Sequence, residues 1–411
     1  MTPFLQFSIS LVVIIVAAKI GGYISYRLRQ PSVMGELLAG LLLGPSIIDF
    51  LHWPYFTDGH LTETIHGMAE VGVLLLMFIA GLDLHITDLT RSGKVAALAG
   101  GLGVVFPLLL GIGVGVGFSM DLASSIFLGL VLSATSVSIS AQTLMELKVL
   151  RSRVGITLLG AAVFDDVLVV LGLSIFAVVL NTGLENGLLS IFWVILRMFL
   201  YLAGATFLGL WLLPKISAKV ESLPISRGLT AFTFVVILLY AWTAEILGGM
   251  AALTGAFLAG VILSQSQVKE RIETRIATLA YGVFVPIFFV NVGLSANARE
   301  LTGGSGLLFL ALLLVAVIGK VFGCGLGANL TGFSRLESIQ LGAGMMSRGE
   351  VGLIVASVGI AEGWIGQEIF AAVVGMVIVT TLLTPPSLRY LFSRDKSPEM
   401  RKKVIQEGGN G

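Results

Sequence analysis

Long apolar stretches separated by short polar loops run through almost the whole chain. A helix that crosses a bilayer needs about 20 mostly apolar residues, and this pattern predicts thirteen such spans. The sequence therefore predicts an all-α polytopic membrane protein, a single transporter unit over residues 1–411 with a short polar tail at 394–411. The predicted spans are approximately 4–26, 33–51, 66–84, 94–118, 122–145, 154–180, 188–213, 228–247, 249–265, 276–295, 305–330, 337–361 and 367–388.

Lysine and arginine gather in alternate loops of this topology. The loops after odd-numbered spans, together with the tail, hold 20 of the 25 basic residues, whereas the loops after even-numbered spans hold only Arg299. Basic loops stay on the cytoplasmic side of a membrane. We therefore expect an integral protein of the plasma (inner) membrane, with thirteen crossings, its N-terminus outside and its C-terminus in the cytoplasm. The first span has no basic segment before it and no small-residue cleavage site after it, so it is predicted to remain as a span.

The composition agrees with a membrane protein and narrows the chemistry. Hydrophobic residues make up 56% of the chain and charged residues only 12%, against about 25% charged residues in soluble domains. The single cysteine, Cys324, lies in an apolar stretch, which excludes a disulfide framework and a cysteine-based metal site. Phosphate-cradling, HExxH and GxSxG motifs are absent from the sequence. We expect no enzyme, no cofactor and no nucleic-acid partner.

Two pairs of spans have similar sequences. Residues 35–43 and 255–263 agree at five of nine positions, and residues 72–82 resemble 282–294. Both pairs are seven spans apart, and because seven is odd, the two halves would lie in the membrane with opposite topology. The sequence therefore predicts two inverted six-helix repeats and a linker helix, at about 4–180, 228–393 and 188–213.

Two adjacent carboxylates, Asp165 and Asp166, lie inside a stretch that is otherwise apolar from residue 154 to 180. A charge at the centre of a membrane helix costs about 2.5–3.5 kcal/mol. Consecutive helical residues point about 100° apart, so the two carboxylates cannot easily share one partner. Lys320, the only charge between residues 307 and 322, is the candidate partner for one of them, although it could instead extend to the membrane surface. The other carboxylate could face a water-filled cavity and bind a cation or a proton.

Two predicted spans contain residues that fit poorly in a membrane helix. Residues 133–140 are rich in serine and threonine, and residues 342–352 are rich in glycine and charge. Interruptions at matching places in two inverted halves indicate a site near the middle of the membrane, although serines could also bond back to the preceding helical turn. We predict two discontinuous helices, with Arg348 and Glu350 as a structural pair or as partners of backbone carbonyls.

Several short motifs follow one another in a fixed order along the chain. They are Ala134-Thr135-Ser136, 142–147, 160–167, 255–260, 286–293, Lys320 and 348–352. This set resembles the monovalent cation:proton antiporter-2 family, and most closely its NapA-type sodium/proton antiporters. The resemblance covers essentially the whole chain.

This resemblance implies a homodimer in which each protomer has a dimerisation domain and an ion-translocating core with two crossed, unwound helices. It implies that Asp166 is the main ion-carrying carboxylate, which binds the monovalent cation, and that Asp165 is the partner of Lys320. It places Thr135 and Ser136 at the helix crossing, within the ion- and proton-binding site. Potassium-efflux relatives of the Kef type carry a C-terminal regulatory domain, and we expect none here.

We therefore predict a secondary active antiporter that exchanges Na+ for H+ by alternating access at Asp166. Oxygen ligands suit a hard cation, but residue types alone do not distinguish Na+ from K+ or Li+. The alternative is a K+/H+ antiporter, or a Kef-like potassium efflux system without its regulatory domain. A cation channel, an organic-anion symporter and an intramembrane aspartyl protease are further alternatives. The protease is disfavoured because adjacent aspartates on one helix do not face each other.

Overall fold

The computed structural model describes residues 1–28, 30–84, 86–182, 184–224, 226–295 and 306–394. All regular elements within these ranges are helical, including one 3-10 turn (η1) and two π-helical turns (η2 and η3). The elements are α1 Pro3–Arg27, α2 Ser32–Leu43, η1 Phe50–His52, α3 Leu61–Leu82, α4 Ile86–Gly117, α5 Leu122–Ser133, α6 Val137–Glu146, α7 Arg153–Thr182, α8 Leu184–Ser222, α9 Gly228–Thr243, η2 Ala244–Gly248, α10 Ala252–Leu263, α11 Lys269–Leu279, η3 Ala280–Phe284, α12 Val285–Leu294, α13 Gly306–Leu330, α14 Arg335–Gly344, α15 Glu350–Ala361 and α16 Gln367–Ser393.

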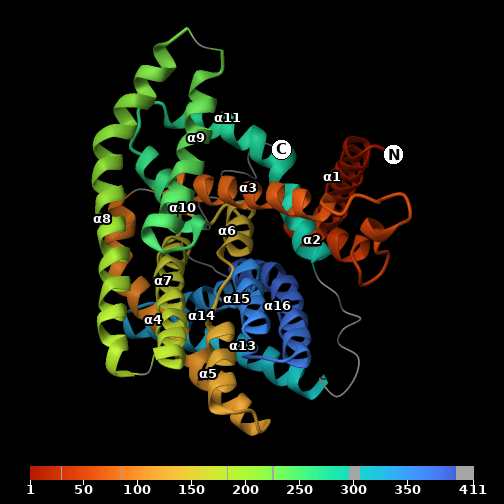
Figure 1. Ribbon diagram of the computed structural model, residues 1–411. Helices are drawn as coiled ribbons and strands as arrows, with labels where there is room; N and C mark the ends of the chain where they lie inside the picture. Colours follow the sequence, from red (N-terminus) through yellow and green to blue (C-terminus); the bar gives the residue numbers. More distant parts are fainter. Residues whose placement is uncertain (29, 85, 183, 225, 296–305, 395–411) are drawn as a thin grey trace.

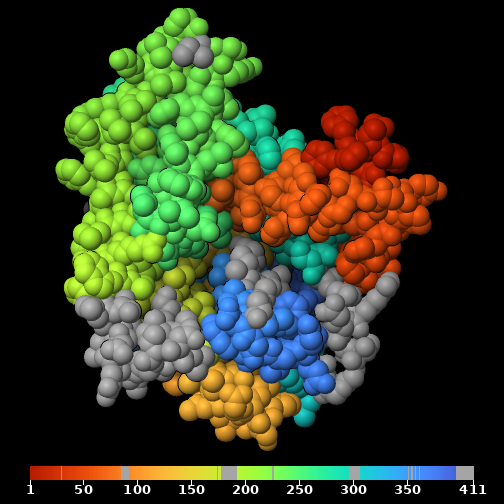
Figure 2. Space-filling view, in the orientation of Figure 1, coloured from red at the N-terminus to blue at the C-terminus, as the bar shows by residue number. Residues whose placement is uncertain are grey.

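The helices form two groups that pack mainly within themselves. The scaffold group comprises α1–α3 and α8–α12, in which α3 packs on α10 and α2 on α12. The core group comprises α4–α7 and α13–α16, in which α4 lies between α5, α7 and α13. Figure 1 shows the long helix α8 along one side of the molecule, beside α9 and α10. Figure 2 shows the scaffold surface, green for α8–α10 and red to orange for α1–α3, above the blue surface of α16.

Each predicted span overlaps a helix or a pair of helices, although their lengths differ. Ten helical segments in the described part of the chain are long and apolar enough to cross a membrane, while α2 and α10 are shorter apolar helices. The predicted span 33–51 was too long, because α2 ends at Leu43. Gly44 is extended there, as expected for a residue that precedes a proline. The all-helical membrane fold is confirmed, and the number of thirteen crossings stays a prediction.

The predicted boundary between spans 228–247 and 249–265 coincides with a break between α9 and α10. Gly249, with φ of 64°, adopts the left-handed conformation at the end of the π-helical turn η2, and α10 begins at Ala252. The Arg197 side chain of α8 donates to the carbonyl oxygens of Ile246 and, at 2.6 Å, Leu247. The arginine thus satisfies carbonyl groups that the end of the helix leaves free.

Glycines of the repeated motif lie where helices cross in backbone contact. An ideal Cβ on Gly40 of α2 would lie 2.1 Å from the carbonyl oxygen of Val290 in α12. One on Gly260 of α10 would lie 2.1 Å from the carbonyl oxygen of Phe78 in α3. Small residues permit such close approach of membrane helices. The packing of α2 on α12 therefore resembles that of α10 on α3.

Candidate ion site

The two predicted discontinuous helices are interrupted in the structure, and their breaks bond to each other. The first break lies between α5 and α6, and the second between α14 and α15. Ser136 N–H donates to the Ser347 carbonyl oxygen at 2.9 Å, and the Ser347 hydroxyl donates to the Ser136 carbonyl. The Ser140 hydroxyl donates to the Gly344 carbonyl. Backbone groups freed inside a membrane must find partners in the protein, and each break here supplies partners for the other.

Arg348, in the second break, is completely buried. Its guanidinium donates to the carbonyl oxygens of Leu132 at 2.6 Å, Met345 at 3.2 Å and Ala316 at 3.4 Å. Leu132 lies in the last turn of α5, where carbonyl groups lack helical partners. Arg348 thus contacts backbone carbonyls, one of the two arrangements expected from the sequence. The prediction also named Glu350, whose side chain lies outside the described residues.

Asp165 and Lys320 form an ion pair inside the core group. Lys320 Nζ of α13 donates to Asp165 Oδ1 of α7, and both side chains are fully buried. Asp165 Oδ2 has no hydrogen-bond partner among the described residues. Two charges withdrawn from water in this way are tolerable only because each is the counter-charge of the other.

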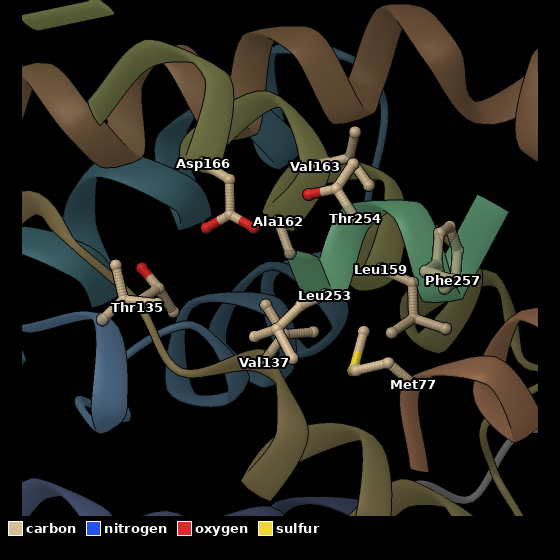
Figure 3. A pocket seen from close by; sticks show the side chains of 11 residues that line it. Met77, Thr135, Val137, Leu159, Ala162, Val163, Asp166, Leu253, Thr254 and Phe257 are labelled. Carbon is tan, nitrogen blue, oxygen red and sulfur yellow. The ribbon is translucent and has the colours of Figure 1, made fainter. Parts of the chain in front are cut away.

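Asp166 lies on another face of α7 and lines a cavity of about 10 Å³ between the core and scaffold groups. A water molecule needs a cavity of about this size. The Asp166 side chain is half-buried, and Figure 3 shows it together with Thr135 and Thr254 around the cavity. The other lining side chains are apolar and come from α3, α6, α7, α10 and α15. The cavity therefore offers one carboxylate and two hydroxyl groups to an ion.

The structure separates the residues that the sequence grouped into one site. Asp166 and Thr135 line the cavity, whereas Ser136 does not and is instead bonded within the helix crossing. Thr254, which the scaffold group contributes, was not among the residues predicted for the site. The available signal was its position as the only polar side chain between residues 251 and 263, directly after the break at Gly249. Among the described residues, no group of three or more His, Cys, Asp or Glu side chains could hold a metal ion.

A polar contact joins the core to the scaffold away from this cavity. The Glu146 carboxylate at the end of α6 accepts bonds from the Ser32 N–H at 2.6 Å, the Ser32 hydroxyl and the Val33 N–H at 3.3 Å. Gln142 Nε2 of α6 donates to the same carboxylate at 3.0 Å. A negative charge is favourable at the positive end of a helix dipole. Glu146 thus caps α2 from the other helix group.

The fold and the site define the class of the protein. It is an all-helical membrane protein in which two broken helices cross beside a buried ion pair and a cavity lined by a carboxylate. A family model described as "Sodium/hydrogen exchanger, transmembrane" matches residues 12–394. The chain belongs to the sodium/hydrogen exchanger family. The prediction of an integral multi-pass membrane transporter is therefore confirmed at the level of the family.

Individual relatives match over nearly their whole length. The chain is 37% identical over 400 residues to the Na(+)/H(+)-K(+) antiporter GerN of Bacillus cereus, covering 97% of this chain and 99% of that protein. It is 35% identical over 433 residues to the high-affinity Na(+)/H(+) antiporter NhaS3 of Synechocystis, covering 97% and 92%. Its fold is similar to that of the sodium proton antiporter MjNhaP1 from Methanocaldococcus jannaschii, with a TM-score of 0.68, 17% identity and coverage of 97% and 100%.

Proposed function

We propose that the chain is a secondary active antiporter that exchanges Na+ for H+ by alternating access, with Asp166 binding the two ions in turn. One observation carries this proposal. Among the described residues that line the cavity between the two helix groups, Asp166 is the only carboxylate, and its neighbour Asp165 faces away from the cavity in an ion pair with Lys320. The names of the relatives, which include Na+/H+ antiporters, support the same function.

Competition at Asp166 couples the two ion fluxes. A single carboxylate does not hold a sodium ion and a proton at the same time, so binding of one ion displaces the other. The Thr135 hydroxyl adds an uncharged oxygen beside the carboxylate, and hydroxyl and carboxylate oxygens suit a hard cation. We propose that the helix crossing, which includes Ser136 and Arg348, holds these oxygens in place.

Alternating access requires the core group to move against the scaffold group. The Asp166 cavity is lined by both groups, so such a movement would open it toward one side of the membrane at a time. The Glu146 contact with α2 would have to break during this movement. The matched glycine crossings of α2 on α12 and α10 on α3 support two inverted repeats. We also propose a homodimer with its N-terminus outside and its C-terminus in the cytoplasm.

The ion pair allows an electrogenic cycle. If cation binding at Asp166 breaks the pair between Asp165 and Lys320, a second proton can travel with each exchange. Net charge then crosses the membrane, and the exchange rate depends on the membrane potential. An exchange rate insensitive to a clamped potential would contradict this version of the mechanism.

The second candidate function is K+/H+ exchange, because the name of the relative GerN includes K+. Cavity size and ligand field, which residue type alone does not fix, decide between these ions. Proteoliposome assays with Na+, K+ and Li+ at several pH values and a clamped potential would separate the two functions.

The function is tested by dissipation of a pH gradient in proteoliposomes on addition of Na+. We expect robust dissipation by the wild-type protein and none by Asp166→Asn, because the carboxamide binds neither ion as a carboxylate does. Asp58→Asn is a matched control in a loop, where the Asp58 carboxylate accepts a bond from the His60 N–H and lies outside the cavity lining among the described residues. Near-normal exchange by Asp166→Asn would refute the assignment.

A further inference from the structure

Thr254 is the one polar group that the scaffold group contributes to the Asp166 cavity. It is the third residue of α10 and is 4% exposed. Its hydroxyl has no hydrogen-bond partner among the described residues. Figure 3 shows the hydroxyl oxygen on the side of Thr254 that faces the Asp166 carboxylate. A buried hydroxyl without a partner is costly, so this one lies where a bound ion or water would satisfy it.

Other buried threonines show the usual alternative, which Thr254 lacks. Thr143 and Thr233 donate to the carbonyl oxygens four residues earlier, Ile139 and Leu229, at 2.7 and 2.8 Å. This bond to the preceding turn is the common arrangement for a threonine inside a helix. Because α10 begins at Ala252, no helical carbonyl lies four residues before Thr254. Its hydroxyl is therefore available to the cavity.

We propose that the Thr254 hydroxyl is a ligand of the transported monovalent cation, contributed by the scaffold and acting with Asp166 and Thr135. This inference rests on the proposed antiport function and adds to it a residue that sets ion affinity. The three oxygen-bearing side chains come from α10, α7 and the break before α6. Thr135 Oγ1 is likewise buried without a partner among the described residues. One small ion in a cavity of about 10 Å³ would satisfy both hydroxyl groups.

The location of Thr254 makes its contribution specific to one conformation. Asp166 and Thr135 belong to the core group and move with the ion, whereas Thr254 belongs to the scaffold group and stays behind. The cation therefore contacts the Thr254 hydroxyl in the conformation described here and loses it when the core moves. Thr254 accordingly changes the apparent ion affinity on one side of the membrane and leaves the other side unchanged.

The test is Thr254→Val, which keeps the shape of the side chain and removes the oxygen. The apparent KM for Na+ is measured at the cytoplasmic face in everted vesicles and at the external face in right-side-out vesicles. We expect KM to rise about 5- to 10-fold at one face, as for the loss of one polar contact. We expect the maximal rate and the KM at the other face to stay unchanged. Thr254→Ser, which retains the oxygen, should restore the wild-type KM.

Thr157→Val is the matched control. Thr157 is also buried, with a hydroxyl that has no partner among the described residues, but it does not line the cavity. We expect its KM at both faces to equal that of the wild type. If Thr254→Val fails to fold, Thr254→Ala provides the same comparison, because it removes the oxygen and adds no bulk.

The outcomes distinguish a failure of this inference from a failure of the proposed antiport function. An unchanged KM in Thr254→Val, an equal rise at both faces, or a loss of maximal rate alone would overturn the role of Thr254. In each of these cases Asp166→Asn would still abolish exchange. An absence of cation-dependent exchange in the wild-type protein would instead overturn the proposed function.

Discussion

Asp165 and Asp166 are neighbours in sequence but lie on two faces of α7 with opposite surroundings. Asp165 faces the inside of the core group, is fully buried and pairs with Lys320. Asp166 is half-buried and lines the cavity between the core and scaffold groups. One helical step of about 100° separates them. The surroundings of a carboxylate in a membrane helix therefore depend on which face of the helix it occupies, since residue type and depth are nearly the same for these two aspartates.

The largest effect on stability is expected from breaking the pair on the Asp165 face. Lys320→Met leaves the Asp165 carboxylate buried without its counter-charge, which should lower the free energy of unfolding by about 3–5 kcal/mol. Asp166→Asn should change stability much less, because Asp166 is half-buried at a cavity whereas Asp165 is fully buried. Thermal unfolding of the purified variants in detergent measures the difference.

The double variant Asp165→Asn/Lys320→Met is the control for this prediction. It removes both charges together, so it should recover most of the stability lost in Lys320→Met. A loss of stability in Asp166→Asn as large as that in Lys320→Met would break the distinction between the two faces.

A smaller effect is expected at the helix crossing that holds Thr135 beside Asp166. An ideal Cβ on Gly349 would lie 2.6 Å from Ser136 Oγ, so Gly349→Ala must push the two breaks apart. Overpacking of this kind costs about 1–3 kcal/mol, and we expect both the melting temperature and the exchange rate to fall. Gly204→Ala is the matched control, since a Cβ there would meet nothing within 4 Å. Equal behaviour of the two variants would contradict the tight crossing.

The smallest effect is expected at Asp121, an exposed carboxylate that gives a baseline for the two carboxylates of α7. Asp121 caps α5, and hydrogen bonds from the Ser124 hydroxyl and N–H hold the pKa of its carboxyl below the ordinary value. A lowered pKa favours the folded state above the ordinary aspartate range, and this contribution is lost as the pH falls toward the folded pKa. The cap contributes at most about 1 kcal/mol.

Melting temperatures between neutral and acidic pH measure this contribution. Asp121→Asn keeps a capping oxygen that does not titrate, so the variant should lose less stability than the wild type on acidification. Identical pH profiles for the two proteins would show that titration of the Asp121 carboxyl does not contribute to stability.

The polar features of the core group could be predicted from sequence because each is costly in a membrane. A lone lysine in an apolar helix needs a counter-charge, which indicated Lys320 as a partner for the aspartate pair. The serine- and threonine-rich residues 133–140 and the glycine- and charge-rich residues 342–352 likewise indicated two discontinuous helices. In both cases the cost of an unsatisfied group restricts the structures that are possible.

Other features depend on packing and could not be predicted in the same way. The isolated position of Thr254 after the break at Gly249 sets it apart in the sequence, but a single threonine in an apolar helix needs no special partner, so this signal did not show that Thr254 lines the same cavity as Asp166. The end of α8 was placed near residue 213, whereas the helix continues to Ser222. Its final turns include Lys215 and Lys219, and charged residues are compatible with a helix that extends beyond the membrane.

The central claim is that cation and proton compete for Asp166, and proton release tests it most directly. NaCl is added to the purified protein in a weakly buffered detergent solution containing a pH indicator, with choline chloride as the ionic-strength control. We predict that Na+ releases protons from the wild-type protein in a saturable manner and that choline does not. We predict no saturable release from Asp166→Asn. Equal saturable release from Asp166→Asn and the wild type would contradict the account.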